Sequence, residues 1–208
     1  MNPVASEHSS ALLIIDMQND FVLPGAPLYV AGAPETVPRI RVVLEAFRKR
    51  DRPIIHVTRE HRPDGSDVEI TRRDRFLETG GFLIPGTPGC AIVDALHPCS
   101  GENRIVKKRF SGFFQTGLDA LLRRCRVTRL VLTGTQLPNC VRATAVDGLS
   151  LDYFVTVLRD ACSSQTPEIH EANLRDLAYL GIPCPTVDQF LKDEAEGVPL
   201  PPETVRGS

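Results

Sequence analysis

The chain has 208 residues, of which 42% are hydrophobic and 24% are charged, and its formal net charge at pH 7 is -2. This balance gives no general attraction for nucleic acid or for an anionic membrane, so we expect neither as a partner. No apolar run approaches the roughly 20 residues that a transmembrane helix needs, and no basic segment followed by an apolar signal stretch opens the sequence. We therefore expect a single soluble domain over residues 1–208, cytoplasmic if the source is a bacterium.

Six cysteines are scattered along the chain without a C-x-x-C pair, at Cys90, Cys99, Cys125, Cys140, Cys162 and Cys184. This spacing argues against a zinc knuckle, a redox dithiol and the disulfide scaffold of a small secreted protein. We expect reduced thiols, most of which only fill space in the core.

Apolar runs and helical patterns alternate along the first part of the chain. Residues 1–10 are small and polar and are predicted to be a loose arm. The next elements are, in order, an apolar strand over 11–16, a loop over 21–33, an amphipathic helix over 35–50 and a strand over 53–58. The first strand is apolar on both faces and ends on Asp16, as a buried parallel strand often does.

A segment without a clear hydrophobic period follows the second strand. From residue 63 to residue 88 the sequence is first charged and then rich in Gly and Pro. A loop of this length inside a compact domain is usually functional. We therefore predict that it forms a rim over a pocket.

The alternation continues to the end of the chain. The predicted elements are a short helix over 91–96, a strand over 104–107, a helix over 117–126, a strand over 128–133, a helix over 138–149, a strand over 153–158, a helix over 166–180, a short strand near Cys184 and a helix from Val187. The Pro-rich residues 197–208 are predicted to be loose. This order predicts an α/β fold with three layers, α/β/α, around a doubly wound, mostly parallel, Rossmann-like sheet of six strands.

Three polar residues lie at or just after the carboxyl ends of predicted strands, namely Asp16, Lys107 and Cys140. Right-handed crossovers bring these ends to one edge of the sheet. Cys140 follows Pro138, which marks a helix start, and a helix N-terminus lowers the pKa of a thiol. A nucleophilic thiol with a base and a cation would support attack on a carbonyl carbon. A buried, inert cysteine and an aspartate that caps a turn remain the structural alternatives.

Three separated motifs carry a resemblance to a known family: IIDMQNDF at residues 14–21, VKKRFSGF at 106–113 and NCV at 139–141. In this order, over roughly residues 11–190, they resemble the isochorismatase-like cysteine hydrolases. That family includes nicotinamidases, N-carbamoylsarcosine amidases and ureidoacrylate amidases.

The resemblance implies a role for each matched residue. Asp16 would be the proton acceptor, Lys107 its charge partner and Cys140 the nucleophile, with the Lys-x-Arg-aromatic-Ser spacing selecting Lys107 over Lys108. It further implies a cis peptide between Thr135 and Gln136, which would set the Gln136 N–H beside that of Cys140 as an oxyanion hole. Homo-oligomers, either dimers or tetramers, are also implied.

Residues near these motifs are candidates for binding a small-molecule substrate. Phe21, Phe113 and Leu137 are candidate pocket walls, with aromatic or aliphatic core packing as the alternative for each. Arg59 and His61, at the end of the second predicted strand, are candidates for contacting a polar substrate. A salt-bridged rim is the alternative for these two and for Glu60 between them.

The sequence departs from the nicotinamidase pattern at a metal-binding motif. Nicotinamidases of this family carry Asp-x-His within Thr-x-Asp-x-His-Pro, and pairing Thr58 and Pro63 with that frame puts Glu60 and Arg62 at the two ligand positions. Arg has no free lone pair for a cation. We therefore predict no bound metal and no other cofactor, and we do not expect nicotinamide as the substrate.

The function that follows is hydrolysis of a C–N bond in a small amide or ureido compound through a thioester on Cys140. Two alternatives remain. The chain would be a catalytically idle relative that serves as a binding or scaffold protein, or a vinyl-ether hydrolase of the isochorismatase type, for which the cysteine is not needed.

Overall fold

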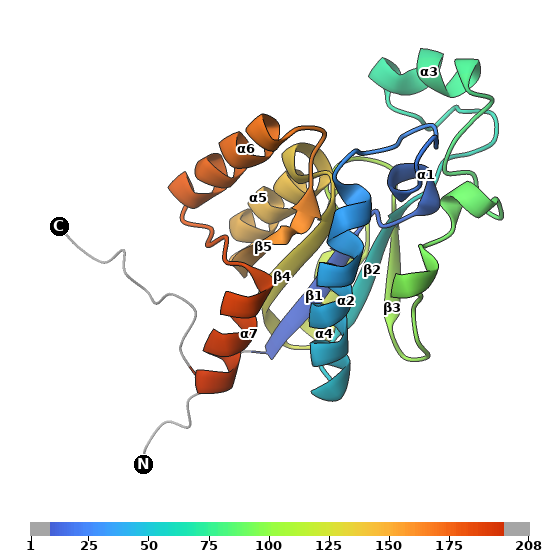
Figure 1. Cartoon of the computed structure of the whole chain (residues 1–208). Coiled ribbons are helices and arrows are strands. Elements are labelled where there is room, and N and C mark those ends of the chain that lie inside the picture. Colours follow the sequence, from blue (N-terminus) through green and yellow to red (C-terminus); the bar gives the residue numbers. More distant parts are fainter. Residues whose placement is uncertain (1–8, 198–208) are drawn as a thin grey trace.

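The computed structural model describes residues 9–197, and the predicted loose segments before and after them lie largely outside the described residues. A parallel sheet of five strands forms the centre, in the order β3-β2-β1-β4-β5 (Figure 1). The strands are β1 (Ser9–Ile15), β2 (Ile54–Arg59), β3 (Asn103–Lys107), β4 (Val127–Thr135) and β5 (Phe154–Ser163). The predicted doubly wound α/β fold is confirmed.

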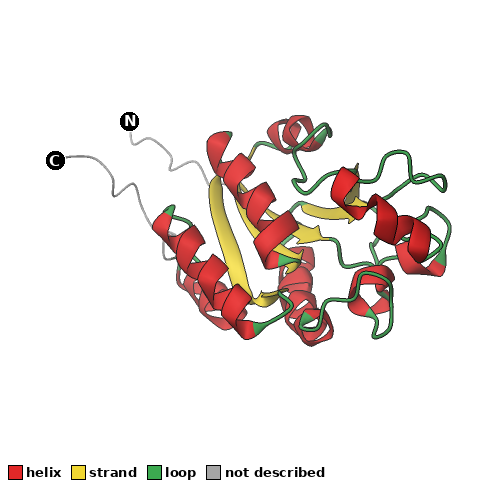
Figure 2. Cartoon of the chain, turned by 90° about the horizontal axis from the view of Figure 1, so that it is seen from above, coloured by secondary structure: helices red, strands yellow, loops and turns green. Residues whose placement is uncertain are grey.

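Helices cover both faces of the sheet, as the view from above shows (Figure 2). One face packs against α2 (Ala33–Lys49) and α7 (Val187–Glu196), and the other against α4 (Leu118–Arg124), α5 (Arg142–Ser150) and α6 (Pro167–Tyr179). In β1, Leu12 and Ile14 belong to the first core, whereas Leu13 and Ile15 belong to the second. The central strand is apolar from Ala11 to Ile15, as expected for a strand buried on both sides.

Local sequence signals explain where the later helices begin. The Thr166 side chain accepts a hydrogen bond from the Ile169 N–H, and Pro167 occupies the first turn of α6. At the start of α7, Thr186 and Gln189 form a reciprocal capping box. Gly197 ends α7 in the left-handed conformation that glycine adopts without strain.

The chain changes direction across the sheet between β1 and β4. From β1 it builds outward through β2 to β3, and then it returns to add β4 and β5 on the other side. Gly134 sits at this junction with φ +114°, and a Cβ there would lie 2.1 Å from the Ile15 carbonyl oxygen. In open α/β sheets, ligands bind at the carboxyl ends of the strands beside such a reversal.

The predicted sixth strand near Cys184 does not form, so the sheet has five strands. The segment still lies along β5, since the Val157 N–H donates to the Pro183 carbonyl and the Arg159 N–H donates to the Pro185 carbonyl, both at 3.0 Å. Neither proline has an N–H to donate in return, so a ladder cannot form.

Two other predicted elements differ from the structure. Ser9 and Ser10 do not form a loose arm, because they belong to β1 and pair with β4. The predicted helix over 91–96 is replaced by two short 3-10 turns, Pro88–Cys90 and Asp94–Leu96. Between these turns, the backbone bonds with residues 17–19, which compete with the helical pattern for the same N–H and C=O groups.

The aperiodic segment over 63–88 contains regular structure that its sequence does not reveal. It holds a 3-10 turn, Ile70–Arg72, followed by the short helix α3 (Arg73–Glu78). This part protrudes beside α1 (Asn19–Val22), beyond the carboxyl ends of the strands (Figure 1). Phe76 anchors it, because its ring meets that of Phe82 edge to face at a centroid distance of 5.0 Å.

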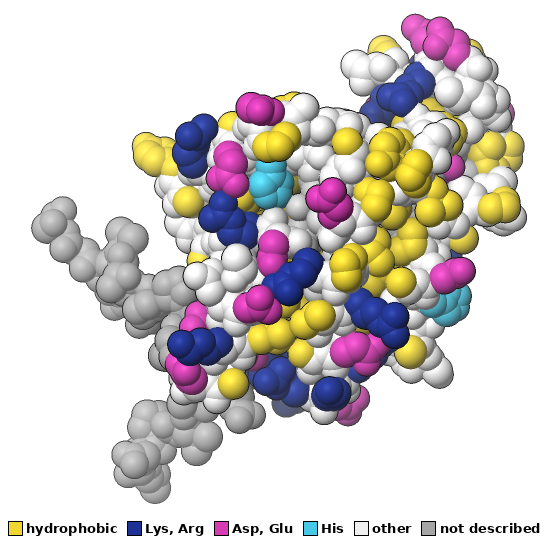
Figure 3. All heavy atoms as spheres, in the orientation of Figure 1, with side chains coloured by type: hydrophobic (Ala, Val, Ile, Leu, Met, Phe, Trp, Pro, Cys, Tyr) yellow, Lys and Arg dark blue, Asp and Glu magenta, His cyan; other side chains and the backbone are white. Residues whose placement is uncertain are grey.

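Charged side chains of both signs are interspersed over the face shown in Figure 3, where neither sign gathers into one patch. Hydrophobic side chains collect on the same face toward the protruding segment. Among the described residues, no helix has the length and apolarity needed to cross a membrane.

Candidate active site

The structure brings Asp16 and Lys107 into direct contact. Asp16 follows β1 with φ +53°, and Lys107 is the last residue of β3. Lys107 Nζ lies 2.7 Å from Asp16 Oδ2, and neither side chain is exposed to solvent. Lys107 also donates to the Arg109 carbonyl at 3.2 Å. Asp16 Oδ1 has no hydrogen-bond partner within the described chain, so one buried carboxylate oxygen remains available.

Cys140 lies in a π-helical turn, Leu137–Val141, between the end of β4 and α5. The peptide bond between Thr135 and Gln136, just before this turn, is cis, as the family resemblance implied. Thr144 holds the turn from the next helix, because its hydroxyl donates to the Cys140 carbonyl at 2.7 Å. The Cys140 side chain is 3% exposed.

Arg59, the last residue of β2, points into the same site. Its Nη2 donates to Cys140 Sγ at 3.3 Å and to the Arg109 carbonyl at 2.9 Å, while Nη1 forms an ion pair with Glu69. The guanidinium lies 5.2 Å from the centroid of the Phe110 ring. Arg59 is fully buried rather than on a rim, so its contacts are made with the protein itself.

Burial raises the pKa of the Cys140 thiol above its ordinary value, although the charges of Lys107 and Arg59 act to lower it. The expected lowering by a helix N-terminus is therefore wrong for this state. The physical reason is that desolvation of a buried thiolate outweighs the effect of the turn. A thiol of this kind needs a nearby base to take its proton, and Asp16 is the acidic neighbour.

Arg59 carries its charge despite its burial. Desolvation acts against the charged guanidinium, but the negative charges of Asp16 and Glu69, and that of Cys140 when it is a thiolate, outweigh it and raise the pKa of Arg59. Glu69 shows the matching effect: burial opposes its charge, yet Arg59 holds the pKa of this carboxyl below its usual range. The site therefore contains a charged Arg59–Glu69 pair besides the Lys107–Asp16 pair.

The candidate substrate residues fall into different surroundings. Phe21 and Gln136 line a cavity of about 70 Å³, together with Leu28, Tyr29, Arg72, Arg75 and Gln165. Leu137 is fully buried in the core. Phe113 stacks on Tyr153 with ring centroids 6.0 Å apart. The structure brings Phe21 and Gln136 to a common cavity, and core contacts surround Leu137 and Phe113.

His61 lies in a packed environment behind Arg59. Its ring meets those of Phe76 and Phe82 edge to face, and its side chain is fully buried. Burial and the charge of Arg59 lower the pKa of His61 to about 4, so the ring is neutral near pH 7. These contacts tie the protruding segment to the end of β2.

Sequence reasoning did not identify Glu69 or Arg72 as part of the site. Glu69 pairs with Arg59, and the Arg72 guanidinium lies 5.1 Å from the centroid of the same Phe110 ring. Both come from the segment without a hydrophobic period, so no pattern indicated which of its charges turn inward. The only signal was the unusual length of the segment.

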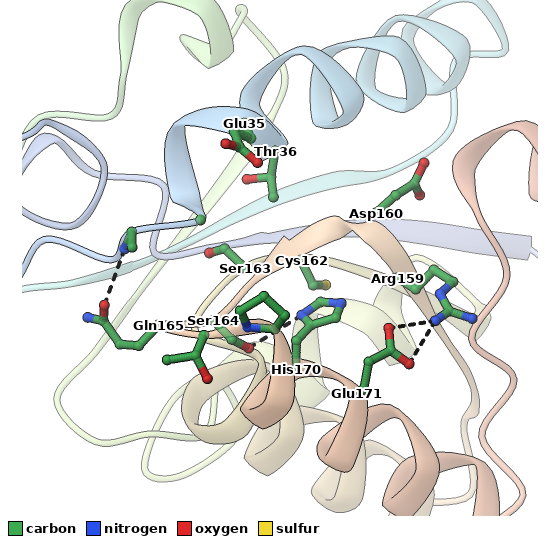
Figure 4. A pocket seen from close by; sticks show the side chains of 14 residues that line it. Glu35, Thr36, Arg159, Asp160, Cys162, Ser163, Ser164, Gln165, His170 and Glu171 are labelled. Carbon is green, nitrogen blue, oxygen red and sulfur yellow. Dashed lines mark hydrogen bonds and ion pairs between the residues drawn. The ribbon is translucent and has the colours of Figure 1, made fainter.

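A larger cavity, of about 540 Å³, lies at the carboxyl end of β5 and the starts of α2 and α6 (Figure 4). Its charged side chains largely satisfy one another, since Arg159 binds Glu171 and Asp160 binds Arg39. Cys162 lines it, but burial raises the pKa of this thiol and no cation contacts the sulfur in the described structure. Among the described residues, the cavity therefore holds no cysteine with a cation in contact to stabilise its thiolate.

The residues at the metal-motif positions of nicotinamidases do not fit a metal ion here. Glu60 is paired with Arg104, and Arg62 offers no lone pair. Over residues 9–197, no three His, Cys, Asp or Glu side chains gather in a geometry that could hold a cation.

Comparisons with known proteins identify the family of the chain. The family model described as "Isochorismatase domain" matches residues 10–189. A crystal structure of an isochorismatase family protein from Desulfovibrio vulgaris is 50% identical, with a TM-score of 0.87, over 90% of this chain and 99% of that one.

Two curated relatives differ in what their names state. A protein of Arabidopsis thaliana described as a probable inactive nicotinamidase is 44% identical over 90% of this chain and 97% of its own length. The ureidoacrylate amidohydrolase RutB of Caulobacter vibrioides is 34% identical over 77% of this chain and 79% of its own. The matched domain and these identities lead to one conclusion: the chain is a member of the isochorismatase family.

Proposed function

We propose that this protein is a cysteine-dependent amidohydrolase that cleaves a C–N bond in a small amide or ureido compound. The observation that carries the proposal is the buried Lys107–Asp16 ion pair of 2.7 Å in the same site as the Cys140 thiol. A base with a free oxygen, a cation and a thiol are the groups that covalent hydrolysis of an amide requires.

In the first step, Asp16 takes the Cys140 proton and the thiolate attacks the carbonyl carbon of the substrate. The backbone N–H groups of Gln136 and Cys140 would hold the oxyanion that develops on the carbonyl oxygen. Asp16 then gives its proton to the leaving nitrogen, so that the C–N bond breaks and an acyl thioester remains on Cys140. Donors of this kind typically contribute about a hundredfold to a thousandfold in rate each.

In the second step, Asp16 acts again as the base. It removes a proton from a water molecule, which attacks the thioester carbonyl. The C–S bond then breaks, the carboxylic acid leaves, and Asp16 returns the proton to the departing sulfur, which restores the Cys140 thiol. Lys107 keeps the Asp16 carboxylate oriented in both steps through its hydrogen bond to Oδ2. One carboxylate therefore serves as acid and base in turn, as microscopic reversibility requires.

A second candidate is a catalytically idle family member that binds a ligand or partner. The observation in its favour is the description of the Arabidopsis relative as a probable inactive nicotinamidase. The vinyl-ether hydrolase that the sequence left open ranks below both, because that chemistry gives the buried thiol with its charged neighbours no role.

Hydrolysis of a panel of small amides, carbamoyl and ureido compounds, measured by release of ammonia, tests the proposal. We expect at least one compound to be hydrolysed by the parent chain and not by Cys140→Ala. Ammonia release that persists in Cys140→Ala would contradict the thioester route. Cys140 that reacts with a thiol probe no faster than Cys125 or Cys162, together with no hydrolysis across the panel, would favour the idle alternative.

A further inference from the structure

The sulfur of Cys140 meets a guanidinium directly. Arg59 Nη2 lies 3.3 Å from Sγ, within the range of a hydrogen bond to sulfur, and both side chains are buried. The ammonium of Lys107 is instead bonded to Asp16 Oδ2 at 2.7 Å. Each of the two cations therefore contacts a different member of the proposed proton-transfer pair.

We propose that Arg59 is a further catalytic residue, which stabilises the Cys140 thiolate while Lys107 stabilises the Asp16 carboxylate. The inference rests on the proposed function in that Cys140 is taken as the nucleophile. The sequence position of Arg59 suggested contact with the substrate, whereas this proposal gives it a role in stabilising the thiolate.

One proton is shared between the Cys140 sulfur and the Asp16 carboxylate in the proposed mechanism. The pair exists as thiol with carboxylate or as thiolate with carboxylic acid, and the total charge is the same in both forms. A charged donor binds an anionic acceptor more strongly than a neutral one. The Lys107 contact thus favours the first form, and the Arg59 contact favours the second. The charge of Lys107 also lowers the pKa of the thiol, but Arg59 is the donor in contact with the sulfur. Without Arg59, the thiolate would therefore lose its hydrogen bond, while burial still favours the neutral thiol.

Arg59 is held in place for this task before any substrate binds. Glu69 forms an ion pair with Nη1, and the Arg109 carbonyl accepts a hydrogen bond from Nη2. The guanidinium carbon lies over the Phe110 ring, 5.2 Å from its centroid. A donor fixed by its surroundings needs no reorganisation when charge develops on sulfur. Glu69 is the positioning residue, since it touches Arg59 and is not in contact with the sulfur.

The charged groups that face Cys140 come from several elements. Asp16 follows β1, Arg59 ends β2 and Lys107 ends β3, and Arg72 comes from the turn before α3. Arg72 lies over the same Phe110 ring as Arg59 but makes no hydrogen bond to the sulfur. It therefore offers a matched control for removal of a positive charge without removal of the contact.

The test is the pH dependence of Cys140 alkylation by iodoacetamide, measured for each cysteine by peptide mass spectrometry. The midpoint of the profile gives the pKa of the thiol, and the plateau at high pH gives its accessibility. Cys99, which is exposed, is the internal reference within each sample. The readout needs no substrate, so it separates this inference from the proposed reaction.

We expect Arg59→Gln to raise the midpoint for Cys140 by about 1–3 pH units, the usual effect of one opposite charge in contact. Because a more basic thiolate is also a better nucleophile, the alkylation rate at pH 7 should fall by about threefold to thirtyfold. Arg72→Gln should shift the midpoint less, and the rate for Cys99 should not change.

The double variant Arg59→Gln with Glu69→Gln guards against misfolding, since it leaves no unpaired charge in the core. It should show the same upward shift as the single variant. A midpoint unchanged in the folded double variant, or a shift in Arg72→Gln as large as that in Arg59→Gln, would overturn the role of Arg59. Loss of amide hydrolysis alone would not, because the alkylation profile stands independently.

Discussion

Cys140 and Cys162 are two thiols with the same burial and different surroundings. Each is 3% exposed, and each lies near the carboxyl edge of the sheet, one after β4 and one within β5. Cys162 Sγ lies 3.8 Å from the Leu132 carbonyl, whereas Cys140 Sγ accepts a hydrogen bond from Arg59. Burial raises the pKa of both thiols, but only Cys140 has cations that act against this effect.

Burial alone therefore does not make a cysteine reactive. A buried thiol with no cation in contact behaves as a small hydrophobic residue. A buried thiol beside a base and two cations has somewhere to place its proton and something to stabilise its anion. The topological reversal between β1 and β4 supplies these neighbours to Cys140.

Replacing each thiol should separate the two sites most strongly. We expect Cys140→Ala to lower the rate of amide hydrolysis by at least about a thousandfold, since no nucleophile remains. Cys162→Ala removes an equally buried sulfur without a charged partner, and its rate should stay within a few-fold of the parent. Equal losses in the two folded variants would remove the distinction drawn between them.

The carboxylates near the two thiols offer the next test. Asp16→Asn should lower kcat by about a hundredfold to ten-thousandfold, the usual contribution of a general base. The matched change, Asp160→Asn, alters a carboxylate that binds Arg39 and the Val187 N–H and should mainly affect stability. Steady-state kinetics and chemical denaturation of both variants measure the two effects. A kcat for Asp16→Asn near the parent value would exclude the proposed base.

Gly134 links the two sites, because it pairs with Ile15 on one side and with Cys162 on the other. A Cβ at this position would overlap the backbone of Ile15, and the positive φ adds strain for any other residue. We expect Gly134→Ala to lower the free energy of unfolding by about 2–4 kcal/mol. Gly181→Ala, at a positive φ with open space around it, should cost less. Urea denaturation compares the two, and equal costs would show that the close approach of β1 and β4 is unimportant.

His61 should make the free energy of unfolding depend on pH. Its pKa is lowered from 6.5 to about 4, so below pH 6.5 the unfolded chain binds a proton that the folded chain does not. The free energy of unfolding should therefore fall as the pH drops, by about 2 kcal/mol between pH 6.5 and pH 5. His61→Phe keeps an aromatic ring beside Phe76 and Phe82 and should flatten this part of the profile. An unchanged slope in His61→Phe would assign the pH dependence to other groups.

Much of the fold follows from patterns that the sequence displays openly. The apolar run before Asp16 predicts a strand buried on both faces, and Pro167 with Gly181 marks the ends of α6. The absence of a sixth strand was also predictable, since Pro183 and Pro185 have no N–H to donate to a strand ladder.

The site was predictable only in part. Strand ends and the three motifs pointed to Asp16, Lys107 and Cys140, and the structure gathers these residues, while their catalytic roles stay a prediction. The contacts of Arg59 with Cys140 and Glu69 were not predictable, because Glu69 lies in a segment without a hydrophobic period. The raised pKa of Cys140 was not predicted either, because the burial of its turn depends on tertiary packing that the local sequence does not show.

The thioester on Cys140 is tested by quenching the enzyme with acid while it hydrolyses an amide and mapping its peptides by mass spectrometry. We expect the peptide with Cys140 to gain the mass of the acyl group, and neither Cys162 nor any other cysteine to do so. Turnover without an acyl adduct on Cys140, in the parent chain and in a parallel sample of Asp16→Asn, would contradict the thioester route.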